Sequence, residues 1–319
     1  MRLDASGADH GAPLTDPSLS PPTQAVESTD GVLLTVHDLG GPGPDPIGAR
    51  RRPILLTHAT GFHGLVWAPV ARHLAGFHAW APDLRGHGAS PTPTDRGMDW
   101  DGFADDVLAV VDALRERSLV EGELVAAGHS KGGAALLLAE QRRPGGTFAA
   151  LYCYEPVVFP PDLASADGAR APEGPNPLAA GARRRRPTFD SRDQAFDHYA
   201  SKPLFSVVDP EALRAYVDHG FVDRPGGGVE LACRPEIEAQ VFEMASTHQA
   251  FAHLGEVTCP VTIATGAGGD FGPADFAEQI ADALPNGRLA RYPDLGHFGP
   301  LEAPARIAAG IAEAVTPPA

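Results

Sequence analysis

The feature that most constrains the fold is the pentapeptide Gly128-His129-Ser130-Lys131-Gly132, which stands between an apolar run and a helical pattern. Residues 124–127 before it are typical of a buried strand, and residues 133–142 after it are typical of a helix. A sharp strand-to-helix turn needs small residues where two segments come close, and the two glycines meet that need. A serine on such a turn can act as a nucleophile once a base activates it. Because the chain has 36 glycines, G-x-S-x-G can also arise by chance, so the motif needs partners elsewhere.

The rest of the chain alternates short apolar runs with stretches of helical periodicity. A hairpin is expected over residues 24–28 and 32–37, because Asp30-Gly31 suits a tight turn. Further strands are predicted at residues 53–57, 78–81, 149–154, 261–265 and 288–292, and helices at 67–74, 98–119, 274–284 and 301–315. Strands that alternate with helices favour βαβ units. The sequence therefore predicts an α/β fold with a mostly parallel sheet flanked by helices.

Residues 157–255 interrupt this alternation, and they divide the chain into parts. They begin with a stretch rich in Pro and Gly, continue through the run Arg183-Arg184-Arg185-Arg186, and then show helical patterns without strands of the βαβ kind. We expect a disordered leader over residues 1–22, a core over 23–156 and 256–316, and a helical cap insertion over 157–255. A solvated cap face or hinge is the favoured interpretation of the arginine run, ahead of steering of an anionic substrate.

Composition excludes several classes of function. The net charge of −16 argues against nucleic-acid binding, which needs a basic face. The three cysteines, Cys153, Cys233 and Cys259, are widely spaced, so buried free thiols and a reducing compartment are expected. Neither a signal peptide nor an apolar run long enough to span a bilayer is evident, which predicts a soluble cytoplasmic protein that binds no membrane. Nucleotide and metal motifs are lacking, so we expect no cofactor, no metal and a small-molecule substrate. The oligomeric state cannot be read from the sequence.

Candidate site residues follow several predicted strands. Ser130, Asp270 and His297 come after separate strands, and so does the loop 58–61. In open α/β sheets, ligands bind outside the carboxyl ends of the strands. The chain order Ser, Asp, His is the one that an α/β-hydrolase triad follows.

In these motifs the sequence resembles the α/β-hydrolase superfamily, in particular its capped serine esterases. The matching stretches run from about residue 24 to 315 and are His58-Ala59-Thr60-Gly61-Phe62 with Trp67, Asp83-Leu84-Arg85-Gly86-His87-Gly88 with Ser90, residues 128–133, Gly266 to Asp270, and Gly296-His297-Phe298 with Glu302 and Pro304. The resemblance implies Ser130 as nucleophile, His297 as general base and later acid, and Asp270 as the carboxylate that orients the imidazole.

Some assignments within the resemblance stay open. The spacing from Gly266 to Asp270 is one residue longer than in the family pattern. Glu155, at the end of the strand after the nucleophile helix, is therefore the main alternative acid, and Asp275 is a weaker one. The backbone N–H of Lys131 is one expected oxyanion donor. The second comes from the loop after His58, where Thr60 is preferred to Ala59, which stands where the family usually has glycine. The Lys131 side chain is expected to point away from the reaction.

Other polar residues near these motifs receive less specific roles. His63, Trp67 and His129 are the tentative pocket residues. Asp105 and Asp106 are expected on the polar face of their helix. Asp83 and Arg85 are expected to fix a turn as a pair.

The expected function is cofactor-independent hydrolysis of a carboxylic ester, thioester or lactone through an acyl-enzyme. Alternatives on the same triad are a lyase, an acyltransferase or a cofactor-free haloperoxidase. A ligand-binding pseudoenzyme is less favoured, because all three triad residue types are present in order.

Overall fold

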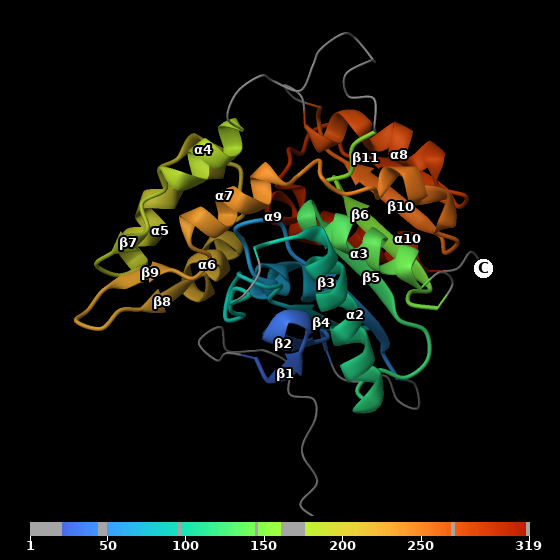
Figure 1. Cartoon of the computed structure of the whole chain (residues 1–319), viewed down its shortest axis with the longest axis horizontal. Coiled ribbons are helices and arrows are strands. Elements are labelled where there is room, and N and C mark those ends of the chain that lie inside the picture. The colour runs from blue at the N-terminus through green and yellow to red at the C-terminus, as the bar shows by residue number, and fades with distance from the viewer. Residues whose placement is uncertain are drawn as a thin grey trace, which may run out of the picture.

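The predicted alternation of strands and helices is present in the computed structural model, which describes residues 21–43, 50–94, 97–143, 146–160, 176–268 and 272–316. Most of the predicted leader therefore lies outside the described residues. The central element is an eight-stranded sheet with the order β1-β2-β4-β3-β5-β6-β10-β11 (Figure 1). Its strands are β1 (Thr23–Glu27), β2 (Leu33–Gly40), β3 (Arg52–Thr57), β4 (Phe77–Pro82), β5 (Val125–His129), β6 (Ala150–Tyr154), β10 (Val261–Thr265) and β11 (Gly287–Arg291).

The sheet is mostly parallel. Only the β1–β2 and β2–β4 pairs are antiparallel, and every pair from β4 to β11 is parallel. The expected hairpin is β1–β2, joined through η1 (Thr29–Gly31), where Asp30 and Gly31 adopt φ of 60° and 70°. These findings confirm the predicted α/β fold class.

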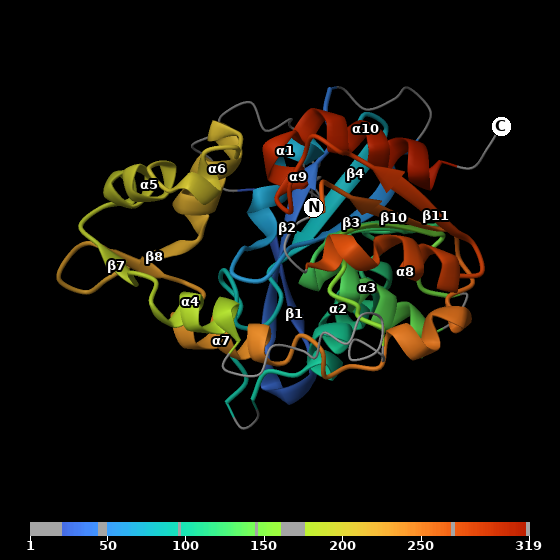
Figure 2. The same ribbon diagram turned by 90° about the horizontal axis from the view of Figure 1, so that it is seen from above.

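Helices cover both faces of the sheet (Figure 2). One face packs against α2 (Trp100–Glu116), α3 (Lys131–Arg142) and α8 (Ala277–Ala283), and the other against α1 (Ala68–Ala71) and α10 (Pro304–Val315). Neighbouring strand residues alternate between the two cores: Leu55 joins the first, whereas Ile54 and Leu56 join the second. Burial on both faces explains why these strands are continuous apolar runs in the sequence.

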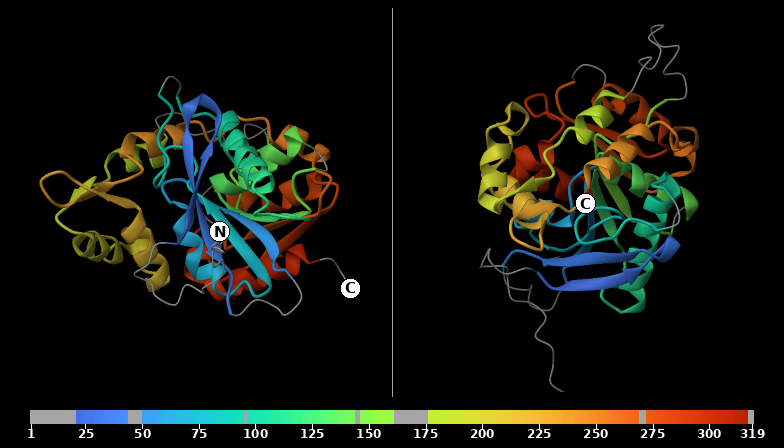
Figure 3. Two further views of the ribbon diagram at one scale, coloured as in Figure 1. Left: turned by 90° about the horizontal axis from the view of Figure 1, so that it is seen from below. Right: turned by 60° about the vertical axis from the view of Figure 1, so that its left-hand side comes forward.

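The segment between β6 and β10 contains four α-helices and a second sheet among its described residues. The helices are α4 (Pro177–Arg183), α5 (Arg192–Ala200), α6 (Pro210–His219) and α7 (Pro235–Glu243), and the three antiparallel strands are β7 (Thr188–Phe189), β8 (Phe221–Asp223) and β9 (Val229–Leu231). Its α4–α7 part, called the inserted segment below, lies beside the main sheet, on the left in Figure 1 and towards the viewer in the right view of Figure 3. The helices match the expectation for this region. The small sheet was not predicted, because strands of two or three residues show no alternation.

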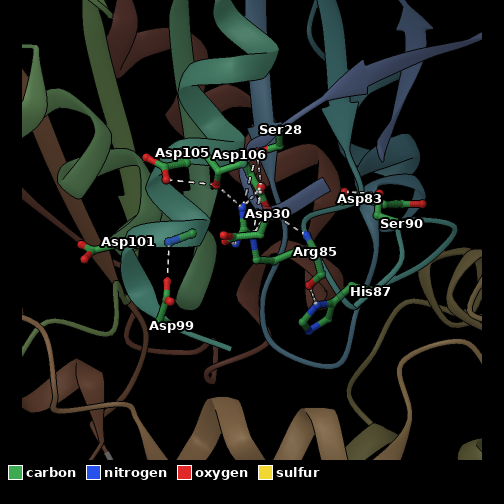
Figure 4. A network of polar contacts seen from close by, with 12 residues as sticks. Ser28, Asp30, Asp83, Arg85, His87, Ser90, Asp99, Asp101, Asp105 and Asp106 are labelled. Carbon is green, nitrogen blue, oxygen red and sulfur yellow. Dashed lines mark hydrogen bonds and ion pairs between the residues drawn. The ribbon is translucent and has the colours of Figure 1, made fainter. Parts of the chain in front are cut away.

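A buried ion pair between Arg85, in the loop after β4, and Asp106 of α2 also binds the amino-terminal hairpin (Figure 4). Asp106 Oδ1 lies 2.8 Å from Arg85 Nη2 and accepts a 2.7 Å hydrogen bond from Ser28 Oγ, and both charged side chains are at most 1% exposed. Arg85 also pairs with Asp30 at 3.0 Å. The expected pairing of Asp83 with Arg85 is therefore corrected: Asp83 instead faces His37 at 3.1 Å and accepts from the Gly64 and Ala89 N–H groups. Asp106 likewise points into the protein rather than lying on the polar face of its helix.

We expect Asp106→Asn to lower the free energy of unfolding by about 3 kcal/mol or more, because it leaves the buried Arg85 charge without its main partner. Asp105→Asn is the matched control, since the neighbouring Asp105 side chain is 31% exposed and its contacts with Arg142 and Thr29 are at the surface. Its cost should be about 1 kcal/mol or less. Urea unfolding followed by circular dichroism measures both, and equal losses in the two variants would contradict this assignment.

Candidate active site

Ser130 stands on a strained turn between β5 and α3. Its φ of 54° and ψ of −117° lie outside the regions that non-glycine residues prefer, at a cost of order 1–3 kcal/mol. The turn is held because Ser130 N donates to Tyr154 O at 2.9 Å and Ser130 O accepts from Ala134 N at 3.1 Å. A Cβ atom on Gly128 would lie 2.6 Å from Gly133 N, and one on Gly132 would lie 2.3 Å from Thr57 O. Both glycines of the motif are therefore required for the close approach that the sequence indicated.

The imidazole of His297 is paired with Glu155. His297 follows β11, and its Nδ1 lies 2.5 Å from Glu155 Oε2. The other carboxylate oxygen, Oε1, accepts from Gly266 N at 2.8 Å and from Thr265 Oγ1 at 3.4 Å. Because a carboxylate oxygen accepts a hydrogen bond, His297 Nδ1 carries a proton and donates it to Glu155. The other ring nitrogen, Nε2, takes no part in this contact. The Glu155 side chain is 2% exposed and that of His297 is 39% exposed, so a buried carboxylate holds an accessible imidazole.

Three further side chains fix the backbone around His297. His129 Nε2 donates to His297 O at 2.8 Å, and Tyr154 OH donates to Gly296 O at 2.7 Å. The Gly296 N–H donates to the Glu302 carboxylate, with Oε2 at 2.9 Å. The loop that carries the imidazole is thus held from both sides, and the role of His129 is to position this loop.

Asp270 and Asp275 are the other two candidates for the acid. Asp270 lies outside the described residues. Asp275 belongs to η5 (Pro273–Phe276), where its Oδ2 accepts from Gly272 N at 2.9 Å and so caps its own turn. The sequence indicated Glu155 by its position after a strand, and the structure shows that its backbone N–H donates to Ala264 O of the neighbouring strand β10.

The loop after β3 brings Thr60 to the carboxyl edge of the sheet. His58 shapes this loop: its Nδ1 donates to Ala59 O at 2.8 Å and its Nε2 accepts from Leu84 N at 3.0 Å. Burial holds the pKa of His58 well below its usual value, which agrees with this neutral tautomer. Among the described residues, no acceptor is found for the Thr60 N–H.

The second candidate donor is the N–H of Lys131, at the start of α3. The first N–H groups of a helix have no partner within the helix, and the Ser130 side chain does not cap this one. The end of β3 is in contact with the start of α3, as the close approach of Gly132 to Thr57 showed. The site therefore offers two backbone donors on segments that touch.

The Lys131 side chain is entirely buried, away from the helix terminus that carries its N–H. Its Nζ lies 3.5 Å from His87 Nδ1 and 4.5 Å from the centre of the Phe103 ring. His87 Nδ1 already donates to Arg85 O at 2.8 Å, so it presents a proton and not a lone pair to the amine. Burial lowers the pKa of Lys131 to about 7. A neutral amine suits this environment.

The three tentative pocket residues are at most 2% exposed. His63 Nε2 donates to Tyr216 O at 3.1 Å on α6, and burial lowers the pKa of His63 to about 4. Trp67 ends η2 (Gly64–Trp67) and packs in the core beneath α1. All three side chains are thus buried, and their contact with a substrate stays a prediction.

Other predictions concern the cysteines, metals and membranes. Cys153, Cys233 and Cys259 are buried free thiols, as expected. Within the described ranges, no group of three or more histidine, cysteine, aspartate or glutamate residues is arranged to hold a metal ion. A search of the same ranges finds no helix with the length and apolar character that crossing a membrane requires.

Comparison with known proteins places this geometry in context. Lipase LipV of Mycobacterium tuberculosis is 28% identical over 270 residues, which cover 83% of this chain and 93% of that protein. The non-heme chloroperoxidase of Burkholderia pyrrocinia is 28% identical over 252 residues, covering 77% and 85%. Among solved structures, E-2-(acetamidomethylene)succinate hydrolase superposes with a TM-score of 0.72 at 20% identity, covering 92% of this chain and 98% of that one.

A family model described as the alpha/beta hydrolase family matches residues 54–310, which is most of the chain. The match begins in β3 and ends in α10, so it includes Ser130, Glu155 and His297 together with the inserted segment. The chain therefore belongs to the alpha/beta hydrolase family.

Proposed function

We propose that the protein is a serine hydrolase that cleaves a carboxylic ester, thioester or lactone through an acyl-enzyme. The observation that carries the proposal is the pair of Glu155 and His297 at the carboxyl edge of the sheet, where β5 presents Ser130 on its strained turn. In this assignment Ser130 is the nucleophile, His297 the general base and Glu155 the acid of the triad. Glu155 takes the place expected for Asp270, because it accepts from the Nδ1 position of the imidazole.

The reaction follows from the roles of these groups. His297 Nε2 takes the Ser130 proton as Oγ bonds to the ester carbonyl carbon, and the Nδ1–H bond to Glu155 stabilises the imidazolium that forms. His297 then returns the proton to the departing alcohol oxygen, and the carbon–oxygen bond of the leaving group breaks. Water, deprotonated by the same imidazole, attacks the acyl-enzyme and releases the acid and free Ser130.

Two backbone N–H groups complete the proposal. We assign those of Thr60 and Lys131 to the oxyanion that develops in each tetrahedral intermediate. A donor of this kind contributes about 3 kcal/mol to the stabilisation of a transition state. The Lys131 side chain takes no part in this role.

The relatives support ester chemistry and leave one second candidate. LipV is named a lipase, which is consistent with hydrolysis at this site. The chloroperoxidase relative favours a variant of the same chemistry. In this variant, hydrogen peroxide in place of water would attack the acyl-enzyme of this protein, giving a peracid and free Ser130, and the peracid would then oxidise a halide. Bromination of an organic dye, in acetate buffer with peroxide and bromide, distinguishes this activity.

For the triad, we expect Glu155→Gln to lower kcat for a short p-nitrophenyl ester by about 10³-fold or more, since the imidazole loses the partner that fixes its tautomer and charge. Asp270→Asn is the control and should stay within about threefold of wild type. Ser130→Ala should lose both turnover and the mass adduct that a fluorophosphonate forms with wild type. A catalytically dead Asp270→Asn beside an active Glu155→Gln would overturn the assignment of the acid, and absence of any Ser130 adduct would overturn the serine hydrolase.

Lys131→Met distinguishes the contribution of the Lys131 amine from that of its backbone N–H, because the variant loses the amine and keeps the N–H. We expect kcat to stay within about threefold of wild type. In wild type the pKa of Lys131 is about 7 folded against 10.5 for the exposed group, so between these pH values the unfolded chain binds the extra proton. The free energy of unfolding of wild type should therefore rise relative to Lys131→Met above pH 7, by about 1.4 kcal/mol per pH unit.

Urea unfolding at pH 6 and pH 9 checks this dependence, because the difference between the two proteins should shrink or reverse at the higher pH. A constant difference would show that the amine does not titrate in this range. A hundredfold loss of kcat with normal Ser130 labelling would instead place the side chain in the reaction.

A further inference from the structure

The arginine run at the end of α4 divides between the surface and the interior. Arg183 forms ion pairs with Glu236 at 2.9 Å and Glu243 at 2.6 Å, and its side chain is 39% exposed. Arg185 has turned inward, and its side chain is 18% exposed. The expected solvated face accounts for Arg183 and leaves Arg185 to be explained.

Arg185 is the centre of a polar cluster formed by several elements of the inserted segment. Its Nη1 pairs with Glu238 of α7, and its Nη2 donates to Tyr199 OH of α5 at 2.8 Å and to Tyr216 OH of α6. A guanidinium has five N–H donors, and three are used in these contacts. Each tyrosine hydroxyl accepts from Arg185 and keeps its own proton to donate.

This cluster lies directly on the loop that carries the proposed oxyanion donor. A Cβ atom on Gly61 would come within 2.5 Å of Glu238 Oε1 and 3.4 Å of Arg185 Nη1. The neighbouring Phe62 packs on Tyr216, with 5.1 Å between the ring centres. Thr60, whose N–H is the proposed oxyanion donor, therefore directly precedes Gly61, which is in contact with the cluster.

The cluster holds more hydrogen-bond donors than acceptors. Two N–H groups of Arg185 and the hydroxyl protons of the two tyrosines are not used in these contacts. The cluster has one carboxylate, that of Glu238, and its Oε1 has no hydrogen bond among the described residues. A buried ion pair contributes little net stability to a fold, so stabilisation alone does not explain why Arg185 and Glu238 are paired here. A second carboxylate is a suitable acceptor for donors of this set.

We propose that Arg185, with Tyr199 and Tyr216, binds a free carboxylate on the acyl group of the substrate, so that the enzyme prefers monoesters of dicarboxylic acids. This inference rests on the proposed ester hydrolysis. The acyl group is the part concerned, because its carbonyl oxygen is the atom that the Thr60 donor holds. Glu238 neutralises Arg185 in the empty enzyme and competes with the substrate carboxylate.

The test compares two p-nitrophenyl esters of matched shape, the hydrogen glutarate and the 5-methylhexanoate. Wild type should have the higher kcat/KM for the glutarate. Arg185→Gln should lower kcat/KM for the glutarate by about ten- to a hundredfold, the usual value of hydrogen bonds to a charged group, and change the neutral ester less than threefold. Glu238→Gln should raise the ratio of glutarate to neutral ester several-fold, because it removes the competing charge.

Arg183→Gln is the matched control, since it removes a guanidinium two residues away whose partners lie at the surface. It should leave the ratio unchanged. Arg185→Gln could lose hydrolysis of both esters because it fails to fold. In that case Glu238→Gln, which keeps Arg185, is the test, and an unchanged ratio of glutarate to neutral ester in that variant overturns the inference. A wild type that labels at Ser130 and hydrolyses both esters equally overturns the carboxylate site alone, whereas a wild type without labelling or turnover overturns the proposed function.

Discussion

The candidate site depends on the hydrogen bonds that the Glu155 carboxylate accepts. It joins the end of β6 to the end of β10 through Gly266 N at 2.8 Å, and to the loop after β11 through His297 Nδ1 at 2.5 Å. Its own backbone N–H donates to Ala264 O, and the residue before it receives the N–H of Ser130. The register of three neighbouring strands, β5, β6 and β10, therefore sets where Ser130 and the imidazole stand, and a shift of one residue would turn these groups to opposite faces.

That dependence on register explains which parts of the site could be predicted. The apolar runs and the residues that follow them were enough to place Ser130 and His297 at one edge of a parallel sheet. The acid was harder to assign, because Glu155 and Asp270 follow strands that are neighbours in the sheet, and strand order is absent from the sequence. Helical periodicity failed for Asp106 for a related reason: it assigns charged residues to the outer face, and a buried partner such as Arg85 reverses that assignment.

Residues beside the reacting groups illustrate a second limit of sequence reasoning. His63 and His129, which were expected at the pocket because they adjoin motifs, are buried and donate to the backbone carbonyls of Tyr216 and His297. Lys131 adjoins the nucleophile itself, and its amine lies against Phe103 of α2. Adjacency in the chain fixes the position of a backbone group, whereas the side chain follows the packing around it. The backbone donors are thus more securely inferred from a motif than the side chains next to them.

The inserted segment shows why selectivity is hardest to read. Phe205 and Tyr216 of this segment pack on Phe298, beside His297, and on Phe62, beside the proposed oxyanion loop, with ring centres 5.8 and 5.1 Å apart respectively. Both loops of the candidate site therefore rest on the same aromatic cluster, and Arg185 reaches it through the Tyr216 hydroxyl. A substitution in this cluster would change the support of the proposed base and of the proposed oxyanion donor together with the proposed carboxylate site. Rate and selectivity are consequently coupled here, and only pairs of substrates that differ in charge alone can separate them.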